Sequence, residues 1–256
     1  MTNRNIILNA DSYKASHYLQ YPPATTQVSS YIEARAGRFE NAVFFGLQMF
    51  IKEYLTKPIT NADIDEAKII MEAHGVPFNE EGWRYIVKEY QGYLPLELQA
   101  IPEGTVMPIR NAMVQVINTD PNCAWLTSYM ETALLRAVWY PTTVATVSYN
   151  CKQVIKKYMF ETTGSIEGIG FKLHDFGARG ATSEESAAIG GAAHLVNFMG
   201  TDTISAIVSA RKYYDADMAG FSIPAAEHST MTCWGKENEA KAYENMLDQF
   251  SKPGKL

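Results

Sequence analysis

The last third of the chain carries four ionisable side chains that could do chemistry, each placed shortly after an apolar run. They are Arg179, Asp202, Glu227 and His228. An arginine in a glycine-flanked turn that leads into a helix favours an anion, particularly a phosphate, although a purely structural turn has the same sequence. A glutamate beside a histidine can act as a general acid–base pair in which the carboxylate orients the imidazole. Together the four residues predict an active site.

Several polar and aromatic residues of the chain have a structural interpretation beside the functional one. Asp202 stands between two threonines at the start of an expected helix, where an aspartate commonly caps the helix, but it could also face a ligand. Phe176 could pack in the core or stack on a planar ligand. His228 could simply hydrogen-bond across its loop. We expect His194 to pack within a helix, and His74 to lie at a helix C-terminus, where it complements the helix dipole.

Positioning these side chains requires short strands that end at a common edge. Apolar runs at residues 171–173, 195–198 and 221–223 each break into a polar cluster that precedes a helix. Strand-then-helix repetition at this spacing predicts parallel βα units, because parallel neighbours need a long crossover. In such folds ligands bind at the carboxyl ends of the strands, where the βα loops converge. We therefore expect the polar clusters to meet at one end of one sheet.

The N-terminal part of the chain follows a different pattern. Period-two alternation between residues 94 and 119 predicts antiparallel strands, and Pro141 suits the first turn of a helix. The other expected elements are a strand at 29–34 and helices at 43–55, 80–90, 124–138 and 141–160, with one more helix between a capping box at 60–63 and Gly75. The predicted fold class is α/β, with a mixed α/β N-terminal region at 1–165 and the first three βα units of an incomplete α/β barrel at 166–256.

Composition and charge narrow the class of protein. The 256 residues are 46% hydrophobic and 20% charged, which is ordinary for a globular protein, and the net charge of −6 argues against nucleic acid as the main partner. No apolar run is long enough to cross a bilayer, so we expect no membrane partner. The three cysteines have neither disulfide nor metal-ligand spacing, which favours a cytoplasmic protein. The scattered histidines disfavour a metal-dependent barrel hydrolase.

The chain resembles the nicotinamide phosphoribosyltransferase family, which belongs to the type II phosphoribosyltransferases. The stretches that carry the resemblance keep the family's order and lie at residues 11–14, 21–23, 139–146, 172–177, 198–203 and 224–230. The resemblance implies transfer of phosphoribosyl from phosphoribosyl pyrophosphate to nicotinamide. The products would be nicotinamide mononucleotide and pyrophosphate, in the first step of NAD salvage. It also implies a homodimer with shared active sites.

The resemblance assigns roles position by position. Phe176 matches the aromatic residue on one side of the nicotinamide ring, and Tyr13 matches the opposite wall, which the other subunit of the dimer supplies. Asp202 matches the carboxylate that holds the amide, and Arg179 matches a residue that binds substrate phosphate and nicotinamide. His228 matches the histidine that ATP phosphorylates, which couples ATP hydrolysis to tighter substrate binding.

Three further positions match substrate contacts of the family. Ser222 and Ala225 lie near the base, and Arg35 reaches a phosphate group, although the loop after Arg35 is shorter than usual. The resemblance also implies two cofactors. Mg²⁺ would be held mostly by substrate phosphates and by the half of the family's sequence that this chain lacks, and ATP would act as an activating co-substrate.

The chain departs from the family in length. A barrel closes with eight βα units and family members are roughly twice as long. We therefore expect a half-length chain that needs its missing half, which a complementary C-terminal chain could provide, and that makes little or no product alone. Two alternatives stay open. One is a phosphoribosyltransferase that uses nicotinate, which repulsion by Asp202 disfavours, and the other is a non-catalytic fragment or assembly partner.

Overall fold

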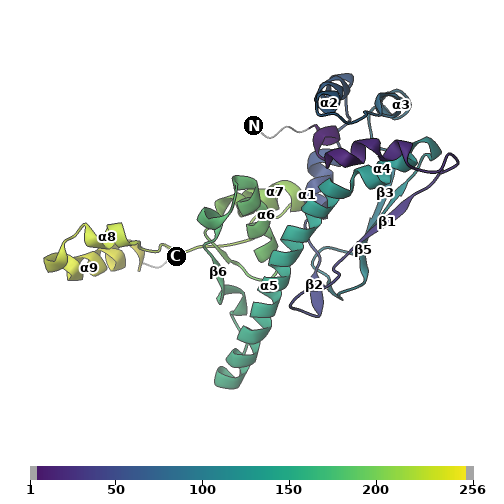
Figure 1. Cartoon of the computed structure of the whole chain (residues 1–256). Helices are drawn as coiled ribbons and strands as arrows, with labels where there is room; N and C mark the ends of the chain where they lie inside the picture. Colours follow the sequence, from purple (N-terminus) through teal and green to yellow (C-terminus); the bar gives the residue numbers. More distant parts are fainter. Residues whose placement is uncertain (1–4, 252–256) are drawn as a thin grey trace.

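The long helix α5 (Glu131–Thr163) connects the two parts of the structure (Figure 1). The computed structural model describes residues 5–251. Of the elements before it, β2 (Asn41–Val43), α1 (Leu47–Phe50) and α4 (Ala124–Tyr129) contact α5, and of the helices after it α6 (Glu184–His194) packs against it. Within the described residues, neither α5 nor any other helix is long and apolar enough to cross a membrane. Helix α5 ends at Gly164 in a left-handed conformation, close to the predicted domain boundary at residue 165, which stays a prediction.

Pro141 lies inside α5, so the prediction of two helices divided at this residue was wrong. The preceding residues form only a short helix, α4 (Ala124–Tyr129). Next to the proline, the Thr142 hydroxyl lies 3.2 Å from the backbone N–H of Phe45, and a Cβ atom on Gly46 would lie 2.3 Å from Pro141 Cγ. Only glycine lets the chain pass this close. This packing holds the helix together across the proline, which by itself favours a break.

The N-terminal strands are antiparallel, as the period-two pattern predicted. Strand β5 lies between β1 and β3, and a separate pair joins β2 with β4. The strands are β1 (Ser29–Glu33), β2 (Asn41–Val43), β3 (Leu96–Ala100), β4 (Val106–Pro108) and β5 (Ala112–Asn118). In β5, Val114 and Val116 are buried while Gln115 between them is exposed. The sheet therefore turns one face to the core and the other to solvent.

Helices α2 (Asn61–Ala73) and α3 (Glu80–Tyr90) lie where the sequence predicted them. The predicted capping box opens α2. The Thr60 hydroxyl accepts from the Asp63 N–H at 3.2 Å, and the Asp63 carboxylate accepts from the Thr60 N–H at 2.8 Å. Gly75, just past the end of α2, has a positive φ of 89° and ends the helix.

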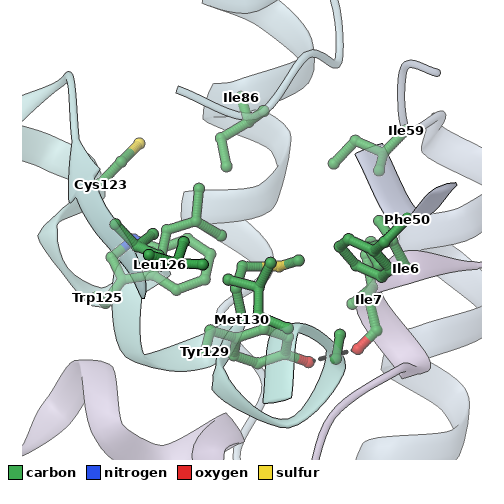
Figure 2. Close-up of a cluster of buried hydrophobic side chains, with 14 of the residues drawn as sticks. Ile6, Ile7, Phe50, Ile59, Ile86, Cys123, Trp125, Leu126, Tyr129 and Met130 are labelled. Atoms are coloured by element: carbon green, nitrogen blue, oxygen red, sulfur yellow. Dashed lines mark hydrogen bonds between the residues drawn. The ribbon is translucent and has the colours of Figure 1, made fainter. Parts of the chain in front are cut away.

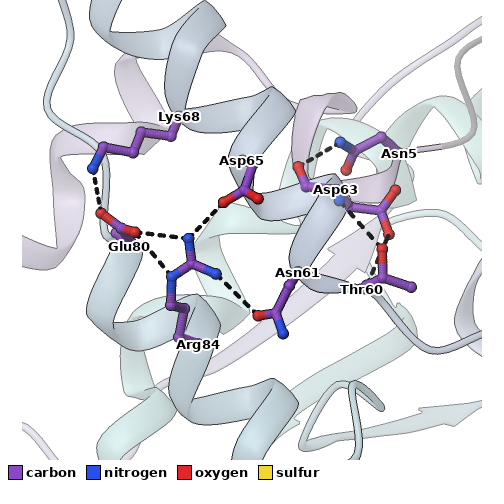
Figure 3. A network of polar contacts seen from close by, with 8 residues as sticks. All are labelled: Asn5, Thr60, Asn61, Asp63, Asp65, Lys68, Glu80 and Arg84. Atoms are coloured by element: carbon purple, nitrogen blue, oxygen red, sulfur yellow. Dashed lines mark hydrogen bonds and ion pairs between the residues drawn. The ribbon is translucent and has the colours of Figure 1, made fainter.

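Polar side chains join α2 to α3 on the surface (Figure 3). Glu80 accepts from the Lys68 ammonium at 2.6 Å and from Arg84 Nε at 2.9 Å. Arg84 also reaches back to α2, where it donates to Asp65 at 2.6 Å and to Asn61 at 3.0 Å. Because these charges are partly exposed, the network fixes the pairing of the two helices more than it adds stability.

The helix predicted at 43–55 is only partly present. Its first residue belongs to β2, α1 covers Leu47–Phe50, and Ile51–Leu55 form a π-helical turn. Glu53 in this turn accepts from the Lys212 ammonium at 2.8 Å, which fastens the N-terminal region to the C-terminal one. A π-helical turn shifts the direction of the side chains that follow, so this contact depends on the irregularity.

An aromatic cluster forms the centre of the N-terminal core. Trp83 is 1% exposed and meets Trp125 and Tyr129 edge-on, with ring centroids 4.8 and 5.1 Å away. Figure 2 shows the Tyr129 hydroxyl turned towards Ile7, to whose carbonyl it donates at 2.6 Å. The cluster therefore joins three segments that are distant in sequence, and the Tyr129 phenol has a hydrogen-bond partner.

Parallel strands follow α5, as predicted, but they are shorter and displaced. Strand β6 (His174–Asp175) pairs with β7 (Gly200–Thr201), and Phe221 continues the sheet through a bridge to β7. The strand predicted at 195–198 was wrong, because residues 195–197 form the turn directly after the helix at Glu184–His194, and Phe198 is buried behind that turn. A short apolar run fits a buried helix end as well as a strand.

Helices α6 (Glu184–His194) and α7 (Ile204–Tyr214) complete the two βα units. Ser183 is the N-cap of α6, and its hydroxyl accepts from the Ser186 N–H at 3.1 Å. The remaining short elements are 3₁₀ helices at Ile6–Leu8, Ser12–Leu19, Pro121–Cys123, Ile169–Phe171, Ala178–Gly180 and Lys236–Asn238. The strand predicted at 171–173 thus begins in a 3₁₀ turn.

The last two helices, α8 (His228–Thr232) and α9 (Glu239–Phe250), pack on each other and project away from the rest of the molecule (Figure 1). Residues 222–227 lead to them without regular secondary structure. The polar residues at 224–230, predicted to lie at the end of the third strand, therefore lie away from the sheet, before and in α8.

The aromatic core gives a direct test of the fold. Trp83→Ala removes a fully buried ring and should lower the free energy of unfolding by about 3–5 kcal/mol. Urea denaturation followed by circular dichroism measures this change. Trp139→Ala is the matched control, because Trp139 is 59% exposed, and it should cost far less. Equal losses for the two variants would contradict the assignment of Trp83 to the core.

Candidate functional site

The carboxyl ends of β6 and β7 bring two loops together. Asp175 lies beside Thr201 in the parallel register, and the Asp202 N–H donates to the Asp175 carbonyl at 2.9 Å. On the other side of β7, the Thr201 N–H donates to the carbonyl of Phe221 at 2.9 Å. The three segments therefore leave the sheet at one edge, which is where ligands bind in folds of this type.

Asp202 receives two side-chain hydrogen bonds at this edge. His174 Nε2 lies 2.6 Å from Asp202 Oδ1, and the Ser222 hydroxyl donates to the same oxygen at 2.5 Å. An ionised carboxylate can only accept, so Nε2 of the imidazole carries the proton. Thr203, not Asp202, is the N-cap of α7. The Asp202 carboxylate is thus turned towards the neighbouring strands.

These donors hold the pKa of Asp202 below its ordinary value. The hydrogen bond from Ser222 contributes most, the bond from His174 comes next, and the positive charge of Arg179 adds to the lowering. Partial burial acts in the opposite direction, more strongly than the charge of Arg179 but less than the two hydrogen bonds. At neutral pH this edge of the sheet therefore presents a charged acceptor that remains 41% exposed.

Phe176 presents an aromatic face close to this carboxylate. Its ring is 61% exposed, and its centroid lies 4.4 Å from that of the His174 imidazole at an angle of 31°. Side chains alternate along a strand, so His174 and Phe176 share one face of the sheet while Asp175 faces the other. The free side of the ring can pack on a flat ligand. We call His174, Phe176, Asp202 and Ser222 the strand-end cluster.

A cavity of about 330 Å³ adjoins the turn after β6 and extends between α5 and α6. Tyr140, His194 and Thr203 line it together with the turn. His194 is buried, as expected for a packed helical residue, and its Nδ1 lies 2.7 Å from the Ser148 hydroxyl. Burial lowers the pKa of His194, so this imidazole is neutral at physiological pH.

Three other predicted residues lie outside the strand-end cluster. Arg179 lies in the 3₁₀ turn after Phe176, where its charge still acts on Asp202. Tyr13 is exposed on the 3₁₀ helix that follows the N-terminus, and Arg35 follows β1. Neither Tyr13 nor Arg35 lines the cavity. Their predicted roles therefore stay predictions.

The remaining predicted residues lie on or before the projecting helices. Ala225 is exposed in the segment before α8. Glu227 directly precedes α8 and accepts a hydrogen bond from the Ser229 hydroxyl, while His228 is the exposed first residue of that helix. In the described part of the chain, no hydrogen bond joins the Glu227 carboxylate to the His228 imidazole. Their acid–base pairing stays a prediction.

His174 is the member of the cluster that the sequence analysis did not single out. It precedes Phe176 by two residues, and residues at that spacing share a face of a strand. This two-residue spacing would have predicted that His174 lies beside Phe176. It could be recognised only if the strand was placed at 174–175 rather than at 171–173.

The described residues do not form a metal site of their own. Between residues 5 and 251, no three His, Cys, Asp or Glu side chains come together in a way that could hold a metal ion. Mg²⁺ demands nearly octahedral oxygen ligands and often takes them from substrate phosphates. The side chains of residues 5–251 therefore fit a Mg²⁺ ion whose main ligands are substrate phosphates.

Two family models match the chain. Residues 5–98 match the model of the nicotinamide phosphoribosyltransferase N-terminal domain, and residues 171–254 match the nicotinate phosphoribosyltransferase (NAPRTase) family. The crystal structure of human nicotinic acid phosphoribosyltransferase superposes with a TM-score of 0.60 at 18% identity, over 87% of this chain and 40% of that one. That likeness shows the fold, and the class is that of the pyridine-base phosphoribosyltransferases.

Curated relatives narrow the class. The chain is 55% identical over 253 residues to a nicotinamide phosphoribosyltransferase of Xanthomonas campestris pv. campestris, which covers 98% of this chain and 54% of the relative. The enzyme of that name from Acinetobacter baylyi is 34% identical over 96% of this chain and 52% of its own. The chain belongs to the nicotinamide phosphoribosyltransferase family. It spans about half the length of the curated relatives it matches.

The pKa of Asp202 gives a test of the cluster geometry. Ser222→Ala removes the strongest donor, so the pKa of Asp202 should rise towards its ordinary value. A carbon-13 NMR titration of the carboxyl group measures the shift. Because the native pKa is lowered, this carboxylate contributes stability above the unfolded-state pKa of about 3.9, and the contribution is lost as pH falls through the native value.

Ser229→Ala is the matched control for this titration, since that hydroxyl donates instead to Glu227, the N-cap residue just before α8. The Ser229 variant should leave the Asp202 titration unchanged. An unaltered Asp202 titration in Ser222→Ala would show that the two side chains are not bonded in solution.

Proposed function

We propose that this chain supplies the base-binding part of a nicotinamide phosphoribosyltransferase. Such an enzyme transfers phosphoribosyl from phosphoribosyl pyrophosphate to nicotinamide and releases pyrophosphate in NAD salvage. The observation that carries the proposal is the strand-end cluster, which places an aromatic face beside an ionised carboxylate at the ligand-binding edge of a parallel sheet. The names of the relatives support the same activity.

The cluster suits nicotinamide for stated chemical reasons. The Phe176 ring packs on one face of the pyridine, and Asp202 accepts a hydrogen bond from the amide nitrogen. Ser222 and His174 fix the direction of that carboxylate. Departure of pyrophosphate leaves an oxocarbenium-like ribose, so the contribution of these residues is to hold the ring nitrogen in line with the reacting carbon.

Other parts of the site would come from further residues and from a second subunit. Arg179 is placed to bind a substrate phosphate beside the base, and Arg35 would reach another phosphate. Tyr13 of the partner subunit would close the open side of the ring, which makes the active form a homodimer. Ala225 would line the pocket near the base. A complementary C-terminal chain could add the length that the relatives have and this chain does not.

We assign the two expected cofactors to the phosphate side of the reaction. Mg²⁺, held mainly by substrate phosphates, would neutralise the negative charge that leaves with pyrophosphate. His228 would accept the γ-phosphoryl group of ATP through a neutral ring nitrogen, with Glu227 beside it in sequence. His228 is exposed, and a phosphoryl donor can reach it. All three cysteines are free, which supports the cytoplasm as the site of action.

Two alternative functions each have one supporting observation and can be tested. A match of residues 171–254 to the nicotinate phosphoribosyltransferase family is what favours nicotinate as the base. Coverage of only about half of each relative favours a non-catalytic assembly partner. An assay with both bases and phosphoribosyl pyrophosphate separates the three. Nicotinamide mononucleotide as the main product supports our proposal, nicotinate mononucleotide supports the first alternative, and no product in any assembly supports the second.

Base selectivity should depend on Asp202. In an active assembly, Asp202→Asn removes a charge that repels the carboxylate of nicotinate, so the preference for nicotinamide should fall by about 1 kcal/mol, or roughly fivefold. We expect the low end of such effects because the carboxylate is 41% exposed. Competition kinetics with both bases measure the preference. Asp215→Asn, a change in a mostly exposed aspartate, is the control, and an unchanged preference in Asp202→Asn would reject the assignment.

Stimulation by ATP should depend on His228. His228→Ala should abolish the stimulation and leave basal transfer in reduced form, because the strand-end cluster is unaffected. Initial rates with and without ATP in an active assembly measure this. His74→Ala, at the exposed end of α2, is the control. An ATP response equal to that of the unmodified enzyme would rule out the phosphoryl-acceptor role.

A further inference from the structure

Asp175 lies directly between two members of the strand-end cluster in sequence, yet its side chain faces the other side of the sheet. Its Oδ1 accepts from the Gly177 N–H at 2.8 Å, which fixes the turn that follows Phe176. Its Oδ2 accepts from the hydroxyl of Thr201 at 3.2 Å. One carboxylate therefore ties the loop that carries Phe176 to the neighbouring strand.

Thr201 extends this connection to the loop that carries Asp202. The Thr201 hydroxyl oxygen also accepts from the Thr203 N–H at 3.0 Å. The Asp202 N–H donates to the Asp175 carbonyl at 2.9 Å. The backbone on both sides of the Asp202 side chain is thus held by the same two residues. Thr201 is 1% exposed, so water does not compete for the hydrogen bond between its hydroxyl and the Thr203 N–H.

Helix α6 closes the far side of this arrangement. A Cβ atom on Gly191 would lie 3.2 Å from Asp175 Oδ2 and 2.6 Å from the Cβ of Ala206. The helix can come this close only because the residue is glycine. Helix α6 therefore lies directly against Oδ2, the oxygen that accepts from Thr201.

The backbone ladder alone is too short to fix the two loops. Strands β6 and β7 have two residues each and share only two pairs, His174 with Gly200 and Asp175 with Thr201. Strands usually have at least three residues, and a two-residue ladder leaves the directions of the following loops weakly determined. Side-chain hydrogen bonds across the ladder supply the missing constraint.

We propose that Asp175 and Thr201 are positioning residues for base binding. They set the separation between the Phe176 ring and the Asp202 carboxylate, and they do so from the opposite face of the sheet without touching the base. The consequence for binding rests on the proposed function. The geometric part concerns this chain alone and can be tested without any ligand.

Substitutions at Thr201 test the proposal in the full chain. Thr201→Val removes the hydroxyl with little change in volume, and Thr201→Ser keeps it. Thr203→Val is a matched control, because Thr203 is also 1% exposed and its hydroxyl has no hydrogen-bond partner in the described structure. A 4-fluorophenylalanine at position 176 reports the ring position by fluorine-19 NMR, and calorimetric titration reports nicotinamide affinity.

We expect Thr201→Val to move the fluorine signal towards that of the unfolded chain and to weaken nicotinamide binding about fivefold, the scale of one lost hydrogen bond. Thr201→Ser and Thr203→Val should stay close to the unmodified chain in both measurements. An unchanged fluorine signal in Thr201→Val would overturn the proposal. So would equal displacement in Thr203→Val, which would indicate a general loss of packing.

The test still decides if Thr201→Val does not fold or if the unmodified chain does not bind nicotinamide. If Thr201→Val does not fold, Asp175→Asn replaces it, because the amide oxygen can still accept from Gly177 while the amide nitrogen cannot accept from Thr201. Asp175→Asn should then give the same displaced signal, and an undisplaced one would overturn the proposal. If the unmodified chain does not bind nicotinamide, the proposed function fails, and the fluorine signal still decides the positioning role.

Discussion

The parallel pairing of β6 with β7 is the constraint on which the rest of this structure depends. Two residues from each strand lie side by side, and everything that follows them leaves at the same edge. This pairing brings the Phe176 ring and the Asp202 carboxylate to the two sides of the His174 imidazole, although they are distant in sequence. Helices α6 and α7 pack closely on each other, and Gly191 of α6 lies against the Asp175 side chain of β6. The site is therefore a product of helix packing as much as of the sheet.

The strand-end cluster is an open site. Phe176 is mostly exposed and Asp202 is partly exposed, so water competes with any ligand for the carboxylate and for the ring face. The ordinary hydrogen bond of such a site gives little affinity until neighbouring groups exclude water. A second aromatic wall and the additional length present in the relatives would change that balance. In the proposed enzyme, this chain would contribute the selective contacts and the additional parts would enclose them.

The sequence predicted the parallel units and the antiparallel sheet because both depend on local pattern. Polar clusters after apolar runs marked the edge at which Asp202 lies, and alternation marked β5. The errors have physical causes in long-range packing. Residues 195–197 form the turn after α6, where packing buries Phe198 without a strand, and Pro141 stays within α5 because Gly46 packs against it. The orientation of His228 was not predictable, since residues 222–227 carry no pattern that fixes the direction of α8.

The central claim is that the strand-end cluster binds nicotinamide between Phe176 and Asp202. The most direct measurement is an intermolecular nuclear Overhauser experiment on the labelled chain with nicotinamide, and with nicotinate as the comparison. We predict contacts from the pyridine protons to the Phe176 ring and from the amide protons to Ser222, with weaker or absent contacts for nicotinate. Contacts of nicotinamide to another part of the chain, with Phe176 and Ser222 unaffected, would contradict the account.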